Sequence, residues 1–265
     1  MVYLHLDSSL LDATRAATMA LPAAGLPRWL GRLRRRGWAL VGPLSILVVA
    51  AAIELSAANA HVLAWIALLL VPPSCALAFG WAARGARPWL AVAALPLFAG
   101  AFAAPDDTVG ELARIALIGG SCITVGRLLA GAAPLTLVKA GLIAMATVDA
   151  VIIFGHLFDQ QNAVFEAAVA TPGLPQLQTA QLGSAGCDYG DFFAAGLAGA
   201  VVAAEGRPQL AAAVAMWLVS QVFNQLFLVV DILPMTVPPA LVLVGIWVFS
   251  AARRPAAPLA PATIG

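Results

Sequence analysis

Apolar runs of roughly 17 to 24 residues recur along this chain, and they constrain its fold more than any other feature. A helix that rises 1.5 Å per residue needs about 20 apolar residues to cross a hydrocarbon core ~30 Å thick. Irregular backbone cannot face lipid, because its polar groups would stay unpaired there. We therefore predict an all-α, polytopic membrane bundle of about eight transmembrane helices, near residues 38–57, 62–82, 88–105, 110–131, 135–158, 183–204, 209–230 and 233–251.

Composition narrows the classes of function. Hydrophobic residues make up 62% of the 265-residue chain, far more than in soluble domains. A formal net charge of +1, without basic clusters interleaved with aromatic residues, indicates no nucleic-acid partner. The odd number of cysteines (Cys75, Cys122 and Cys187) and their lack of metal-ligand spacing predict packing roles, no metal site and no cofactor.

The distribution of charges predicts the orientation in the membrane, because cytoplasmic loops retain Lys and Arg. Arg32 and the arginines at 34–36 precede the first run and place the amino terminus in the cytoplasm. Eight crossings then put further basic residues on the cytoplasmic side (Arg84, Arg87, Arg127, Lys139, Arg207, Arg253, Arg254) and acidic residues on the other (Asp106, Asp107, Asp159, Glu166, Asp231). We expect an integral, multi-pass protein of the plasma (inner) membrane with both termini cytoplasmic.

Two aspartates lie inside apolar runs, where a carboxylate usually marks chemistry or ion movement. Asp149 lies about 13 Å beneath the external end of the fifth run, and Asp191 lies about 12 Å down the sixth run from the same side. Because the two helices are consecutive and antiparallel, they can pack side by side, and the two carboxylates can face each other. Two carboxylates a few ångströms apart in a low dielectric cannot both be ionised, so the pair holds one proton. The ionised partner can deprotonate water while the protonated one hydrogen-bonds a peptide carbonyl, which predicts amide hydrolysis with either aspartate as the base.

Two further features are expected at the level of the aspartates. Gly190 allows a neighbouring backbone to approach closely, as small residues do between membrane helices. In the last run, Pro238 and Pro239 free backbone carbonyls that can pair with an unwound substrate; the alternative is a kink for packing. The candidate substrate-binding residues are Gly190, Pro239, Ala240 and Leu241.

The chain therefore divides into four parts. We predict a cytoplasmic basic tail at 1–37, with or without an interfacial helix, whose arginines lie on anionic lipid headgroups, and an amino-terminal four-helix membrane region at 38–131. A catalytic four-helix membrane region follows at 132–252, and a second cytoplasmic tail at 253–265. Within the catalytic region, the long connection at 159–182 is rich in Pro, Gly and Gln, which predicts an irregular or re-entrant external loop.

Three pieces in order make this sequence resemble the GxGD intramembrane aspartyl proteases, the family of presenilin and signal peptide peptidase. They are the stretch "DAVIIFG" from Asp149, the pair Gly190-Asp191, and the family's PAL motif at Pro239-Ala240-Leu241. The resemblance covers residues 135–250 and implies a presenilin-like fold with Asp149 and Asp191 as catalytic residues. The expected orientation is similar to that of signal peptide peptidase, which implies cleavage of type II helices and remnant signal peptides.

The sequence departs from the family pattern at two positions. Val148 stands where the family has a tyrosine, and Asp188 replaces the first glycine of the GxGD motif. Asp188 is a candidate modulator of the titration of the pair or an interfacial loop residue. His156 lies two turns from Asp149 and is likewise a candidate modulator or a plain interfacial histidine.

These patterns predict an aspartic endopeptidase whose partners are transmembrane helices or signal peptides and the lipid bilayer. Two alternatives remain: a proton- or cation-coupled transporter or channel that uses the same aspartates, and an inactive membrane scaffold of the same fold. A polar stripe in the seventh run either hydrates the site or joins helices: Ser220, Gln221, Asn224 and Gln225. No pattern in the sequence indicates an oligomeric state.

Overall fold

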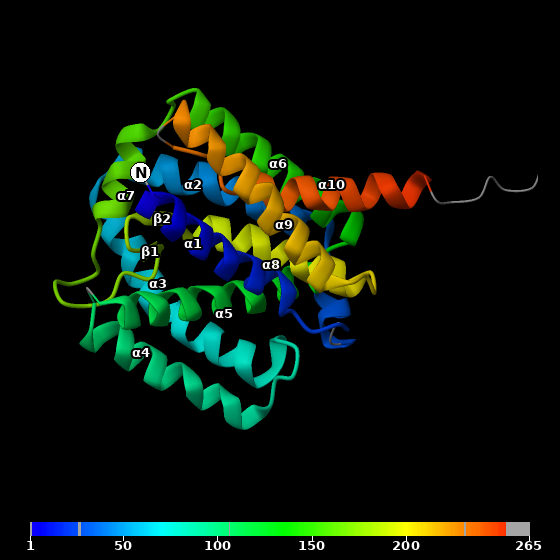
Figure 1. Cartoon of the computed structure of the whole chain (residues 1–265). Helices are drawn as coiled ribbons and strands as arrows, with labels where there is room; N and C mark the ends of the chain where they lie inside the picture. The colour runs from blue at the N-terminus through cyan, green and yellow to red at the C-terminus, as the bar shows by residue number, and fades with distance from the viewer. Residues whose placement is uncertain (1, 26–27, 106, 231, 253–265) are drawn as a thin grey trace, which may run out of the picture.

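The computed structural model describes residues 2–25, 28–105, 107–230 and 232–252, which form a bundle of helices (Figure 1). The α-helices are α1 (Val2–Ala20), α2 (Val41–Leu55), α3 (Ala58–Leu77), α4 (Ala94–Ala103), α5 (Thr108–Ala132), α6 (Leu135–Phe154), α7 (Asp159–Ala167), α8 (Tyr189–Ala204), α9 (Gln209–Phe223) and α10 (Val237–Ala252). Short 3₁₀ segments are η1 (Arg28–Leu33), η2 (Arg36–Leu40), η4 (Pro88–Ala93) and η5 (Asn224–Leu228), and η3 (Ala78–Ala82) is a π-helical turn. The predicted helical class is confirmed.

Five of the described helical segments are long and apolar enough to cross a membrane: Arg36–Leu55, Ala58–Ala82, Thr108–Ala132, Leu135–Phe154 and Gln209–Leu228. Three more are apolar but shorter: Pro88–Ala103, Tyr189–Ala204 and Val237–Phe249. The membrane character of the chain is thus supported, but the count of about eight transmembrane helices is not confirmed, because only the first group has the length for a full crossing.

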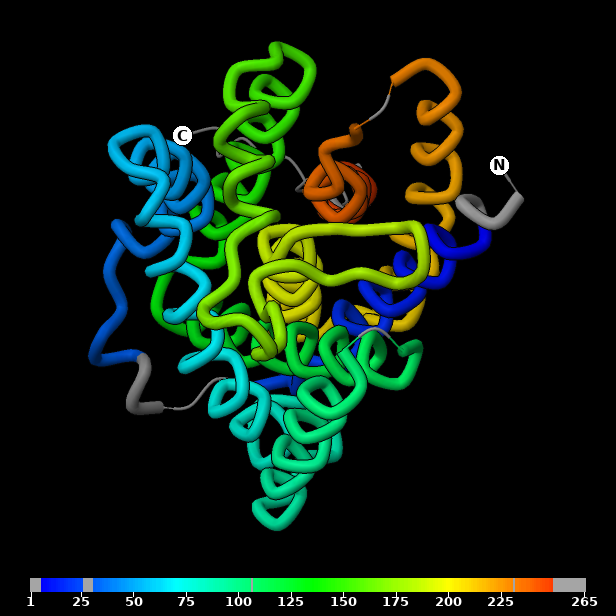
Figure 2. Tube along the Cα trace, turned by 90° about the vertical axis from the view of Figure 1, so that its left-hand side faces the viewer, coloured from blue at the N-terminus to red at the C-terminus, as the bar shows by residue number. Residues whose placement is uncertain are grey.

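Helix α8 lies at the centre of the bundle. In Figure 2 it is seen nearly end-on behind a β-hairpin, and α1, α5, α6, α9 and α10 surround and contact it. Every residue from Phe192 to Ala203 is buried. At Gly196, an added Cβ would lie 2.6 Å from the carbonyl oxygen of Cys122 in α5, so only glycine permits this approach of the two helices.

The segment before α8 is a β-hairpin rather than the start of a helix. Strands β1 (Thr179–Leu182) and β2 (Ala185–Asp188) pair antiparallel through a turn at Gly183 and Ser184. Gly183 has φ +58°, which favours glycine and ends the strand at a tight turn. The apolar run predicted from residue 183 therefore becomes helical only at Tyr189.

The connection between α6 and α8 also contains more regular structure than the predicted irregular or re-entrant loop. It holds the short helix α7 and strand β1. Helix α6 ends at Phe154, earlier than the expected end at residue 158, and His156 follows with a left-handed φ of 51°. Both aspartates consequently lie closer to the ends of their helices than the apolar runs predict.

Helix α1 is the largest departure from the expected layout. Residues 1–37 are predicted as a tail, yet α1 packs against α5, α8 and α9, with Asp12, Arg15 and Met19 buried. The arginines Arg32, Arg34, Arg35 and Arg36 that follow are exposed. The tail predicted at 253–265 lies outside the described residues, as do Asp106, Asp231, Arg253 and Arg254 of the orientation argument.

Candidate active site

Asp149 and Asp191 line one cavity of about 700 Å³. Asp149 lies five residues before the end of α6, and Asp191 is the third residue of α8. Both side chains are half-buried. The structure therefore places the two carboxylates, which the sequence pattern pairs, on the wall of one cavity.

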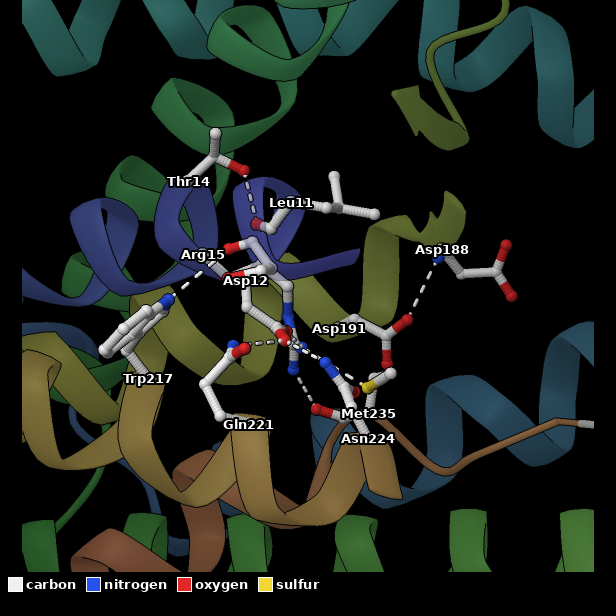
Figure 3. Close-up of polar contacts among 11 residues, drawn as sticks. Leu11, Asp12, Thr14, Arg15, Asp188, Asp191, Trp217, Gln221, Asn224 and Met235 are labelled. Atoms are coloured by element: carbon white, nitrogen blue, oxygen red, sulfur yellow. Dashed lines mark hydrogen bonds and ion pairs between the residues drawn. The ribbon is translucent and has the colours of Figure 1, made fainter. Parts of the chain in front are cut away.

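The first turn of α8 positions Asp191. Asp188 precedes the helix with extended backbone, and its N–H donates a hydrogen bond of 3.0 Å to Oδ2 of Asp191 (Figure 3). This contact is one half of a capping box, in which the third residue of the helix satisfies the backbone of the capping residue. A carboxylate at a helix N-terminus is also favoured by the helix dipole. Asp191 is thus fixed by local backbone structure.

A threonine positions Asp149 from a distant part of the chain. The hydroxyl Oγ1 of Thr236, just before α10, donates a hydrogen bond of 2.6 Å to Oδ2 of Asp149. Thr236 is 2% exposed and lines the same cavity. Thr236 is not among the predicted site residues; its place beside the proline pair, at the expected level of the aspartates, is the signal that could have identified it.

A buried ion pair of α1 forms another part of the cavity wall. Nη1 of Arg15 lies 2.7 Å from Oδ1 of Asp12, and Nη2 donates a hydrogen bond to the carbonyl oxygen of Met235. Arg15 lines the same cavity as Asp149 and Asp191. A segment predicted as a tail therefore supplies the one basic group that lines the cavity among the described residues.

Part of the polar stripe predicted in the seventh run completes this network (Figure 3). Oδ2 of Asp12 accepts hydrogen bonds from Nδ2 of Asn224 at 2.8 Å and from Nε2 of Gln221 at 3.3 Å. Gln221 thus joins α9 to α1 and Asn224 joins η5 to α1, as the helix-joining interpretation predicts. Gln225, in η5, donates to the carbonyl oxygen of Gln221 in α9.

The candidate substrate-binding residues do not all lie in this cavity. Gly190 lines it, but the atom nearest an added Cβ is Cε of Met145 at 3.7 Å, so the predicted close approach of a backbone is wrong. Ala240 and Leu241 line a separate apolar groove of about 440 Å³ between α6 and α10. Pro239 lies in the first turn of α10, where proline is well accommodated and produces no kink.

The two candidate modulators occupy different environments. Asp188 lines the cavity together with Glu166, and Figure 3 shows its side chain directed away from the carboxylate of Asp191. His156 does not line the cavity; its Nδ1 lies 2.9 Å from Oδ2 of Asp159, and both side chains are largely exposed. Asp188 therefore borders the cavity that Asp149 and Asp191 line, and His156 does not.

Among the residues that the structure describes, no group of three or more His, Cys, Asp or Glu residues is arranged to hold a metal ion. Comparisons of the chain with protein-family models, with curated proteins and with solved structures give no match. The grounds for a function are therefore the geometry of the cavity and the motifs in the sequence.

Proposed function

We propose that this protein is an intramembrane aspartyl protease of the GxGD type, which hydrolyses peptide bonds in transmembrane helices or remnant signal peptides. The observation that carries the proposal is the meeting of Asp149, from α6, and Asp191, from α8, at one cavity. The sequence motifs around both aspartates support the same chemistry. Asp188 and Val148 mark this chain as a divergent example of that pattern.

Hydrolysis by such a pair needs no covalent intermediate. The ionised carboxylate removes a proton from a water molecule, and the protonated carboxyl donates its proton toward the carbonyl oxygen of the substrate. Water attacks the carbonyl carbon to give a tetrahedral intermediate. On collapse, the aspartate that took the proton from water gives it to the leaving nitrogen, the other aspartate takes back a proton from a hydroxyl of the intermediate, and the C–N bond breaks. The products are a carboxylic acid and an amine, and the pair returns to its singly protonated state.

The surroundings of the pair suit an unwound substrate. A peptide bond inside an intact helix is hydrogen-bonded within that helix, so cleavage requires local unwinding. The hairpin and the non-helical residues 232–236 both border the cavity, and strand β2 offers extended backbone there. We assign the unwinding of the substrate to the end of the bundle where the hairpin and residues 232–236 border the cavity.

The orientation of the chain belongs to the same proposal. The shorter apolar helices Pro88–Ala103, Tyr189–Ala204 and Val237–Phe249 would complete eight crossings of the plasma (inner) membrane, with both termini in the cytoplasm. The substrates would then be helices of type II orientation, with cytoplasmic amino termini.

The test is cleavage of a labelled type II transmembrane helix by purified protein in proteoliposomes. Asp149→Asn and Asp191→Asn keep side-chain size but remove the acid–base function, and each should lower the rate at least about 100-fold. Asp159→Asn is the matched control, because Asp159 is exposed and pairs with His156 away from the cavity. Unchanged cleavage in both cavity variants would contradict the proposal, and ion flux lost in both variants would identify a transporter. A wild-type protein with neither activity would indicate a scaffold.

A further inference from the structure

Arg15 is a charged residue with almost no contact with solvent. Its side chain is 1% exposed, and it lies in α1, outside the segments that carry the proposed catalytic motif. A buried guanidinium is costly unless it is paired and hydrogen-bonded, and it cannot lose its proton to escape that cost. The partners of Arg15 therefore show what the structure requires of it.

Asp12 holds one side of the Arg15 guanidinium, and Asp12 is in turn held by Gln221 of α9 and Asn224 of η5. Asp12 contacts Nη1 of Arg15, so the ion pair has a fixed place between α1 and α9. A planar guanidinium has donors in a rigid fork, so fixing one nitrogen also aims the other.

The other side of the guanidinium reaches the segment before α10. Nη2 donates to the carbonyl oxygen of Met235, and the sulfur of Met235 lies 3.5 Å from Nη1. Residues 232–236 are not helical, and a turn hydrogen bond of 3.1 Å from the N–H of Val237 to the carbonyl oxygen of Pro234 connects this segment to α10. The next residue, Thr236, donates to Asp149. A continuous set of contacts thus runs from α1 through Met235 and Thr236 to the carboxylate of Asp149.

We propose that Arg15 is a positioning residue: by holding the backbone at Met235, it keeps the hydroxyl of Thr236 against Asp149, so that α1 belongs to the active site. This inference rests on the proposed protease activity for its functional meaning. Arg15 acts through the segment before α10 and needs no contact with substrate.

Arg127 provides a matched control inside the same protein. It is 7% exposed and, like Arg15, donates to backbone carbonyls, at 2.8 Å to Gly25 and 2.6 Å to Trp81. Arg127 does not line the cavity and has no contact with Thr236 or Met235. Replacing it removes a buried arginine without disturbing the proposed set of contacts.

The first experiment is a double-mutant cycle on kcat for the type II substrate, with rates corrected for the folded fraction. Arg15→Gln and Thr236→Val should each lower kcat about tenfold or more, since each removes a hydrogen bond that involves a charged group. The double variant should be no slower than Thr236→Val alone, because Arg15 acts through Thr236. Thr236→Ser should retain activity, and Arg127→Gln should leave kcat near wild type. Multiplying effects in the double variant, or unchanged kcat in Arg15→Gln, would overturn the proposal.

A second experiment measures position without catalysis. In a background where Cys75, Cys122 and Cys187 are alanine, Asp149→Cys and Thr236→Cys create a pair for a short bifunctional thiol reagent, and mass spectrometry quantifies the link. Arg15→Gln should lower the cross-linking rate about tenfold, and Arg127→Gln should not. Equal rates in all backgrounds would overturn the positioning role. A wild-type protein that cleaves nothing while cross-linking still depends on Arg15 would instead refute the protease and keep the positioning role.

Discussion

Helix α8 meets its neighbours differently in its first turn and in its middle turns, although small residues occur in both. In the first turn, Gly190 borders the cavity, and the nearest atom to an added Cβ is a side-chain carbon of Met145 at 3.7 Å. In the middle, an added Cβ at Gly196 or Gly199 would collide with backbone carbonyls of α5 and α1. Backbone thus contacts backbone in the middle, and side chains and open space border the first turn.

The middle turns of α8 fix the position of the helix, whereas its first turn places Asp191 at the cavity. Backbone contacts at Gly196 and Gly199 leave no freedom for α8 to rotate or slide, because no flexible side chain lies between the helices. The rigid middle allows the first turn to border a cavity without losing its position. A site built on a rigid element can hold a carboxylate such as Asp191 within the narrow geometry that catalysis needs.

The largest expected effect is in the middle turns. Gly196→Ala and Gly199→Ala should each lower the free energy of unfolding by about 3 kcal/mol, since the carbonyl oxygens of Cys122 and Met19 cannot move aside as a side chain can. Thermal unfolding in detergent measures the loss. Gly245→Ala in α10 is the control, because nothing lies within 4 Å of its added Cβ, and it should unfold at or above the wild-type temperature. Equal stability of all three variants would show that the backbone contacts at Gly196 and Gly199 do not hold the middle of α8 rigidly.

A smaller effect is expected where the first turn is joined to α5. The hydroxyl of Tyr189 and Oγ of Ser121 lie 2.8 Å apart, and Ser121 is 1% exposed. Tyr189→Phe should cost about 1 kcal/mol of unfolding free energy, because it leaves the serine without this partner. Adding Ser121→Ala should recover most of the loss, since removing both polar groups is nearly neutral. A double variant less stable than Tyr189→Phe would show that the lost hydrogen bond between Tyr189 and Ser121 does not cause the lower stability of Tyr189→Phe.

The smallest change in stability is expected at the cavity itself. Gly190→Ala adds a methyl group at ordinary van der Waals distance from Met145, so the unfolding free energy should change by less than about 0.5 kcal/mol. Unfolding in detergent, beside Gly196→Ala, tests the contrast directly. A loss as large as that of Gly196→Ala would mean that the first turn is packed as tightly as the middle.

The helical class and the lining of one cavity by both aspartates could be predicted from the sequence. Apolar runs of membrane length predict helices because a helix pairs all its backbone polar groups within one segment. Asp149 lies near the end of α6 and Asp191 at the start of α8, so both can line the cavity that the hairpin borders. These features depend on local pattern and on the order of the helices along the chain.

Other parts of the site could not be predicted, because they depend on contacts between distant residues. Asp12 and Arg15 lie in the segment predicted as a tail, and their pairing with each other and the hydrogen bond from Asn224 in η5 make their burial tolerable. The helix start at Tyr189 depends on a turn at Gly183 inside an otherwise apolar run. Thr236 gains its role from a contact with Asp149, 87 positions away in the chain.

A local effect, seen in hydrogen exchange and not in global unfolding, is expected at the hairpin that lies before the first turn. Oδ2 of Asp7 in α1 accepts hydrogen bonds from the backbone N–H of Ser184 at 2.9 Å and from its hydroxyl at 2.8 Å. These bonds lower the pKa of Asp7 from its ordinary value, so the contact is complete above about pH 4 and is lost as the pH falls through the lowered pKa. Asp7→Asn should therefore lower the protection of the turn amides against hydrogen exchange a few-fold at pH 7. In rates corrected for intrinsic exchange, it should also remove the loss of protection that occurs below pH 4. Glu111→Gln, whose carboxylate accepts only the N–H of Gly183 at 3.2 Å, should have less effect because it lacks the second bond. Exchange that responds equally to the two variants would show that both neighbours, α1 and α5, hold the hairpin alike.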